Sequence, residues 1–156
     1  MDCRADVYWN QFLQEKGLGQ DIAYIECFHF DLTAHWANAL LQLVLEGKKR
    51  ATASSLHYFG NNNLPLPKAG DYSIVTDWVG TPHCVIRTTK VTILPFQNIT
   101  WELCKKEGED ESLESWQRGH MHFFTEDGKA EGYEFTPEMP VVFEEFELVY
   151  NDPIKE

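Results

Sequence analysis

The segment HCVIRTTKVTIL, residues 83–94, is the feature that most constrains the fold of this chain. Its β-branched residues indicate a strand. The two alternating sets of side chains both mix apolar and polar residues, so neither face of the strand is cleanly polar. A strand of this kind is covered on both sides, as in a small barrel. The segment therefore predicts a small β-barrel.

Helical patterns occur singly between the extended segments. The clearest helix follows Thr33, a suitable N-cap, and ends at Gly47, where a C-terminal glycine belongs. Because strands outnumber helices, the sequence predicts an α+β fold, a mixed or mostly antiparallel β-barrel with helices packed on its outside. Further helices are expected at about 6–16, 97–107 and 112–124, the last capped by Ser112 or Asp110. Further strands are expected at about 23–30, 50–59, 72–78 and 140–150.

The chain has 156 residues, enough for one domain with its own core. It shows no internal repeat, no low-complexity tract and no interdomain linker. We therefore expect a single domain over residues 1–156, with a core at about 23–150 and an added N-terminal helix at about 6–16.

Charge and hydropathy restrict the partners. The formal net charge is −12, and such a surface repels the phosphate backbone, so a long duplex DNA footprint is disfavoured. A nucleoside or a short single strand entering a locally basic pocket remains compatible. No apolar run approaches the roughly 20 residues of a membrane span, and the N-terminus has no basic start followed by an apolar block. We expect a cytoplasmic protein without a membrane partner.

The sequence contains no metal-binding spacing. The four cysteines lie far apart without a CxxC pair, and the histidines are scattered. His120 and His122 are two residues apart, so on a helix they point away from each other and are interpreted as structural. No metal and no cofactor are expected.

A basic triplet, Lys48 to Arg50, stands where a helical pattern gives way to an extended one. The cations could simply cap the helix, since they interact favourably with its dipole. Alternatively, Lys49 with Thr52 three residues later is a possible base and nucleophile pair. For that role the pKa of Lys49 must fall by about 2–3 units, and Lys48 and Arg50 could cause the shift if the site is partly buried.

Other side chains near this triplet could contact a ligand. Ser54 lies on the same strand face as Thr52. Tyr58 and Trp78 could stack on a base, although aromatic residues near strands are more often core. Asp77 could accept a hydrogen bond from a base or cap a turn. The expected ligand-binding set is therefore Lys48, Arg50, Ser54, Tyr58, Asp77 and Trp78.

Several motifs, taken in order, resemble the ASCH domain family in its longer bacterial form. They are GKKRATAS, GDYSIVTDW, VTILPF, KEGEDESLESW and MPVVFEEFELVY, and the similarity extends from about Tyr8 to Tyr150. The resemblance implies a β-barrel similar to the PUA fold, with outer helices and a cleft for RNA or nucleoside-like ligands.

One branch of this family is N(4)-acetylcytidine amidohydrolase, whose motif has Lys, two residues, then Thr, with a distant Glu. Carried over, Lys49 resembles the proton acceptor, Thr52 the nucleophile and Glu109 the proton donor to the leaving amine. Glu107 or Glu111 could take the place of Glu109. The chain is longer than that branch, with an added N-terminal helix and the insertion HYFGNNNLPLP.

Two functions follow as hypotheses. The first is a metal-independent amidohydrolase that acts on N(4)-acylated cytosine nucleosides. The second is a noncatalytic RNA-binding module, or a ribonuclease as in another branch of the family. The expected partner is a small nucleoside-like ligand or a short single-stranded RNA.

Overall fold

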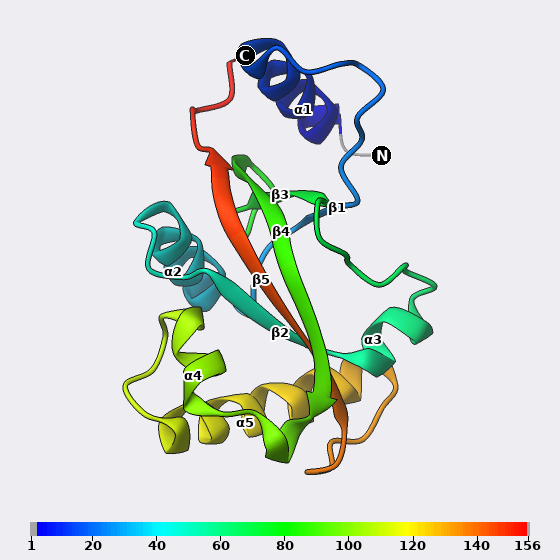
Figure 1. Ribbon diagram of the computed structural model, residues 1–156, viewed down its shortest axis with the longest axis vertical. Helices are drawn as coiled ribbons and strands as arrows, with labels where there is room; N and C mark the ends of the chain where they lie inside the picture. The colour runs from blue at the N-terminus through cyan, green and yellow to red at the C-terminus, as the bar shows by residue number, and fades with distance from the viewer. Residues whose placement is uncertain (1–2, 156) are drawn as a thin grey trace.

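A computed structural model describes residues 3–155 of the chain, with the side chain of Cys3 not described. Five strands form one sheet in the order β1-β3-β4-β5-β2 (Figure 1). Only β1 and β3 pair in parallel, and the other neighbours are antiparallel. The sheet curls into a half-barrel whose edges are β1 and β2, which confirms the expected α+β fold. The strands are β1 (Glu26–Phe28), β2 (Ala51–Ser55), β3 (Tyr72–Thr76), β4 (Pro82–Pro95) and β5 (Pro140–Tyr150).

The helices surround this sheet, as the sequence predicts. No helix within residues 3–155 is both long and apolar enough to cross a membrane. The α-helices are α1 (Cys3–Lys16), α2 (Ala34–Leu45), α3 (Leu56–Asn61), α4 (Trp101–Cys104) and α5 (Leu113–Glu131). Two short 3-10 helices, η1 (Phe96–Asn98) and η2 (Lys105–Glu107), lie on either side of α4.

Local hydrogen bonds explain where the helices begin. The Thr33 side chain accepts a bond from the Trp36 amide, and Ser112, not Asp110, caps α5 through the Ser115 amide. The expectation of extended structure at residues 56–59 is wrong, because the Ser55 hydroxyl accepts from the His57 amide and starts α3.

Two other predicted boundaries need correction. The strand expected at 23–30 is only three residues long, and the helix expected at 97–107 is divided into three short pieces. The helix expected at 112–124 extends to Glu131, where Gly132 adopts a φ of 82° and ends it.

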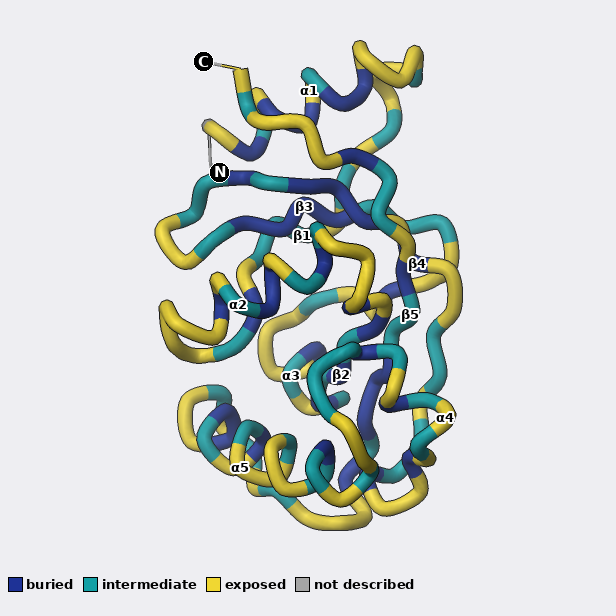
Figure 2. Tube along the Cα trace, turned by 90° about the vertical axis from the view of Figure 1, so that its left-hand side faces the viewer, coloured by how far each residue is buried: buried dark blue, intermediate teal, exposed yellow. Residues whose placement is uncertain are grey.

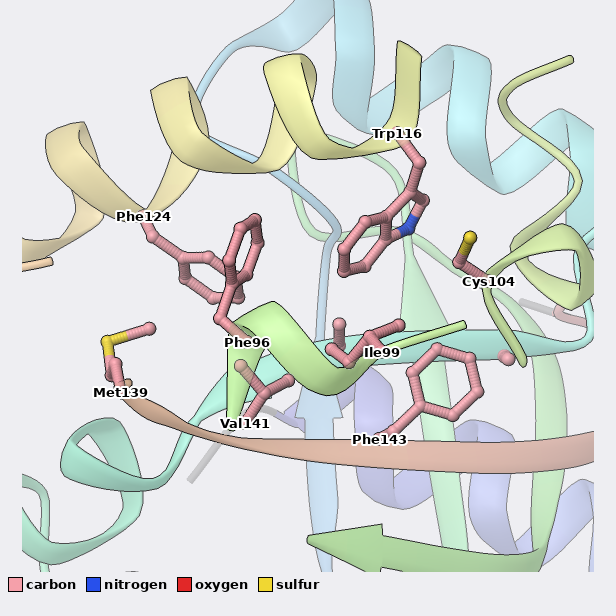
Figure 3. Close-up of a cluster of buried hydrophobic side chains, with 10 residues drawn as sticks. Phe96, Ile99, Cys104, Trp116, Phe124, Met139, Val141 and Phe143 are labelled. Atoms are coloured by element: carbon pink, nitrogen blue, oxygen red, sulfur yellow. The ribbon is translucent and has the colours of Figure 1, made fainter. Parts of the chain in front are cut away.

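Apolar side chains form three clusters around the sheet. Figure 2 shows that β3 is largely buried, whereas the outer turns of the helices are exposed. On one side of β5, Phe143 packs beneath Trp116 and Phe124 of α5 (Figure 3). On the other side, Phe146 packs with Leu40 of α2. The third cluster joins α1 to one end of β3, β4 and β5. Edge strand β2 therefore lies between α2 and α5.

Candidate active site

A cavity of about 610 Å³ lies beside edge strand β2. Its wall combines Thr52 and Ala53 of β2 with residues of α2 and α5 and with the turn that follows η2. The size suits a ligand as large as a nucleoside. Two helices, one strand edge and one turn therefore meet at a single hollow.

Lys49 enters this cavity from the segment just before β2. Only 2% of its surface is exposed. Its Nζ atom donates to the Ala51 carbonyl oxygen at 2.8 Å, to Glu107 Oε1 at 3.2 Å and to Glu109 Oε2 at 2.5 Å. These three contacts use all three donors of the ammonium. The group is thus held in one orientation among two carboxylates.

Gly108 allows both carboxylates to reach the same ammonium. It lies between Glu107 and Glu109 and adopts a φ of 71°, a conformation that favours glycine. A Cβ atom at this position would lie 2.2 Å from the Lys48 carbonyl oxygen. Only glycine lets the turn approach the backbone before β2 this closely.

Glu107 lies at the centre of a charged cluster formed with Lys49, Glu109 and His120. Its Oε2 atom accepts a hydrogen bond from Trp116 Nε1 and lies 3.2 Å from His120 Nε2, while Oε1 contacts Lys49. Burial opposes the charged form, but His120 and Lys49 outweigh it and lower the pKa of Glu107 well below its ordinary value. This carboxylate therefore stays ionised and fixes the two cationic side chains.

The pKa of Glu109 is shifted in the opposite direction from that of Glu107. Its side chain is 19% exposed and lines the cavity. Burial raises its pKa, against the attraction of Lys49, and the Glu107 charge adds to the rise. Glu109 is therefore the carboxyl of this pair that more readily carries a proton.

The expected loss of basicity at Lys49 is wrong. Burial opposes its charged form, but Glu109 and Glu107 outweigh it, so the pKa of Lys49 is raised. The proposed cause is also wrong, because Lys48 and Arg50 are exposed and Lys48 pairs with Glu46 at 3.2 Å. The basic triplet thus separates into one buried cation and two surface cations.

His120 belongs to the cluster, which sequence reasoning missed. Its ring stacks on Trp116 with centroids 4.1 Å apart, and Nδ1 lies 2.9 Å from the Trp116 carbonyl oxygen. Burial opposes its charge, but Glu107 and the hydrogen bond to it raise the pKa of His120. The four-residue interval between Trp116 and His120, which places them on one helix face, was the available signal. His122 also lines the cavity.

Thr52 lines the same cavity from β2. Within residues 3–155 its hydroxyl makes no hydrogen bond, so it is available to a ligand. The structure therefore brings Lys49, Thr52 and Glu109 to one cavity. Of the two alternatives for Glu109, Glu107 lies in the cluster and Glu111 is exposed and outside the cavity wall.

The six expected ligand-binding residues do not line this cavity. Asp77 accepts from the Thr81 amide at 3.0 Å and contacts His83 at 2.9 Å, so it stabilises the turn between β3 and β4. Trp78, in that turn, is 40% exposed and its ring lies 4.8 Å from His29. The residues that lie outside the wall are Lys48, Arg50, Ser54, Tyr58, Asp77 and Trp78.

Three side chains have the donor types of a metal site. Ligand atoms of Glu107, Glu109 and His120 all lie within 4.8 Å of one another, the one such group found in the described part of the chain. However, the Lys49 ammonium already contacts both carboxylates. A divalent ion would have to displace this buried cation or overcome its repulsion.

A half-barrel sheet with outer helices and a cavity at one sheet edge defines a PUA-like α+β domain. The sequence model of the ASCH domain matches residues 26–150, and the chain belongs to the ASCH domain family. The resemblance inferred from the motifs is thereby confirmed.

Solved structures extend this likeness to α1. Protein EF3133 from Enterococcus faecalis V583, described under the family DUF984, is 34% identical, with 95% of this chain and 89% of that chain covered and a TM-score of 0.86. An ASCH domain from Lactobacillus crispatus JV V101 is 28% identical, with 97% of both chains covered and a TM-score of 0.85.

A more distant structure shares the fold alone. It is a variant of the ASCH protein from Zymomonas mobilis, 15% identical over 84% of this chain and 76% of that chain, with a TM-score of 0.51. No curated protein matches the chain.

Proposed function

We propose that this protein is a metal-independent amidohydrolase that removes the acyl group from an N(4)-acylated cytosine nucleoside. One observation carries the proposal: a buried ammonium, Lys49, lies 2.5 Å from the carboxyl of Glu109 in a cavity whose wall also holds Thr52. Amide hydrolysis needs a nucleophile, a group that accepts its proton and a group that protonates the leaving nitrogen. These three residue types supply those roles.

The raised pKa of Lys49 means that its amine is not a base in the resting protein. A proton transfer from Lys49 to Glu109 across their contact changes both groups at once. Lys49 becomes a neutral amine that can accept a proton, and Glu109 becomes a carboxylic acid that can donate one. Burial already raises the pKa of Glu109, which reduces the cost of this transfer. A substrate that expels water from the cavity favours the neutral pair further.

The reaction then proceeds in two steps. The Thr52 hydroxyl oxygen attacks the amide carbonyl carbon while Lys49 takes the hydroxyl proton. The carbon–nitrogen bond breaks, and Glu109 gives its proton to the departing amino group. Water then hydrolyses the acyl-threonine ester, which releases the carboxylic acid and restores the hydroxyl. Lys49 is again an ammonium and Glu109 a carboxylate, as at the start.

The cavity wall supports a neutral, planar ligand. Phe30 and Phe123 supply apolar surface, and Trp36 of α2 is 53% exposed at the wall. Asp110 and Glu126 add negative charge to the wall, which disfavours phosphate groups. A nucleoside fits this environment better than a nucleotide or an RNA strand.

The test is an assay of cytidine release from N(4)-acetylcytidine. We expect turnover by the wild-type protein and a loss of at least about 10³-fold in Thr52→Ala. Ser54→Ala is the matched control, because Ser54 lies on the same face of β2 but outside the cavity wall. Absence of product at high protein concentration, or equal rates in the two variants, contradicts the proposal. Binding of a short RNA at low salt without turnover would favour the RNA-binding hypothesis instead.

A further inference from the structure

The unpaired edge of β2 presents backbone groups to the cavity. In an antiparallel pair, residues alternate between those bonded to the partner strand and those whose N–H and C=O point away from it. The Phe146 amide donates to the Arg50 carbonyl at 3.0 Å, and Thr52 is the residue opposite Glu144. By this register the Arg50 carbonyl and both backbone groups of Thr52 point toward β5, while the Arg50 N–H donates to the Lys106 carbonyl at 2.8 Å.

Ala51 and Ala53 therefore point their backbone N–H and C=O groups away from β5. The Ala51 carbonyl confirms this direction, because it accepts the hydrogen bond from Lys49 Nζ. Ala53 lines the cavity, and no strand lies beyond β2 in the sheet. Within residues 3–155 no hydrogen bond outside the strand pairs involves the Ala53 N–H or C=O.

An unpaired donor in a mostly buried position is costly unless a ligand or water meets it. Ala53 is only 8% exposed. Ala53 directly follows the proposed nucleophile, Thr52. A substrate carbonyl group attacked by the Thr52 hydroxyl could therefore also contact the Ala53 N–H. Backbone donors of this kind stabilise the negative charge that develops on a carbonyl oxygen under attack.

We propose that the Ala53 N–H is the oxyanion donor of this site. This inference rests on the proposed amidohydrolase function and names the group that stabilises the negative charge on the carbonyl oxygen when Thr52 attacks.

The sharpest test replaces the Ala53 amide by an ester, with lactic acid at position 53. This change removes the N–H but keeps the methyl group in the apolar cluster with Phe143, which a proline ring would disturb. We expect kcat to fall about 10²–10³-fold, with a smaller change in KM. The same replacement at Ala51 is the matched control, because its N–H also points off the edge but does not line the cavity. Equal rates in the two ester variants would overturn the inference.

A binding measurement separates this inference from the proposed function. In ¹⁵N-labelled Thr52→Ala protein, N(4)-acetylcytidine should shift the Ala53 amide proton downfield and leave that of Ala51 in place. Turnover by the wild type with no shift at Ala53 would reject the oxyanion role of Ala53 but support the amidohydrolase function. A shift at Ala53 without turnover by the wild type would support ligand binding at Ala53 but reject the amidohydrolase function. If the protein neither binds nor turns over the substrate, both proposals are wrong.

Discussion

Helix α1 lies at one end of the half-barrel and α5 at the other (Figure 1). Both ends bury polar groups, but these groups differ in chemistry. At the α1 end the buried polar groups are neutral phenols. The Tyr8 hydroxyl donates to the Asp152 carbonyl at 2.7 Å, and the Tyr150 hydroxyl accepts from Gln11 at 2.8 Å. At the cavity end the buried groups are charged, with Lys49 and Glu107 each 2% exposed.

The difference between neutral and charged buried groups indicates that the two ends bury polar side chains for different reasons. A hydrogen-bonded phenol adds apolar area and loses little solvation energy. A buried ion pair loses several kcal/mol of solvation per ion, and well-packed hydrophobic residues often replace such pairs at no loss of stability. The phenols at the α1 end therefore hold α1 on the sheet, whereas the buried charges at the cavity agree with the proposed catalytic site.

The largest expected effect is that of removing the central cation. In Lys49→Met, Glu107 and Glu109 lose their shared partner inside the protein, so the free energy of unfolding should fall by about 3–5 kcal/mol. Urea unfolding measures it. Lys48→Met is the control, because the Lys48 side chain is 66% exposed and should change the midpoint little. Equal midpoints for the two variants would show that the cluster does not hold the site together.

A core truncation at the other end should cost stability without touching the chemistry. Phe12 is 2% exposed and its ring lies 5.0 Å from that of Trp9. Phe12→Ala should lower the free energy of unfolding by about 3–4 kcal/mol. Turnover per folded molecule, measured well below the melting temperature, should stay near the wild-type value. A large loss of turnover at full folding would mean that the two ends are coupled.

Glu109→Gln should have the opposite effect to Phe12→Ala, with a loss of turnover but little loss of stability. The pKa of Glu109 is raised by burial, so a neutral amide costs the folded state little, but it cannot donate a proton to the leaving nitrogen. We expect turnover to fall about 10²-fold or more, with nearly unchanged urea unfolding. Glu111→Gln, a change two residues away at an exposed side chain, serves as the control. Similar rates for both variants would exclude Glu109 as the acid.

The contrast also explains what the sequence could predict. Periodicity located α2 because one face of it, including Leu40, Leu41 and Val44, packs on the sheet. It failed at residues 56–59, where a single hydrogen bond from the His57 amide to the Ser55 hydroxyl starts a helix. Local patterns carry information on burial, whereas short elements depend on individual capping bonds.

The site was predictable in part for a similar reason. Lys49, Thr52 and Glu109 were identified through the family motif, and the structure places them at one cavity. The charge balance was not predictable, because Glu107 reaches Lys49 through the turn at Gly108, and His120 reaches Glu107 through the packing of α5. Contacts 58 and 60 residues apart in sequence reverse the pKa shift expected from Lys48 and Arg50.

The smallest expected effect is a pH dependence of stability at the cavity end. Burial opposes the charge of His120, but Glu107 outweighs it and raises the pKa of His120 on folding. A group with a raised folded-state pKa stabilises fully below its unfolded pKa of about 6.5, and its contribution is lost as the pH rises through the folded-state pKa. His120→Gln removes that contribution. The stability deficit of His120→Gln should therefore be larger at pH 5.5 than at pH 9, by about 1 kcal/mol or more.

Urea unfolding of both proteins across this pH range measures the difference. The lowered pKa of Glu107 has the opposite sign, since its contribution is lost only as the pH falls from its unfolded pKa of about 4.3 toward the folded-state value, below the range used. Glu109, which also faces this cluster, titrates in both proteins and largely cancels in their difference. A ¹H NMR titration of the His120 ring gives its pKa directly. A deficit that stays constant from pH 5.5 to pH 9 would mean that His120 carries no charge beside Glu107, and the cavity end would then hold one buried cation instead of two.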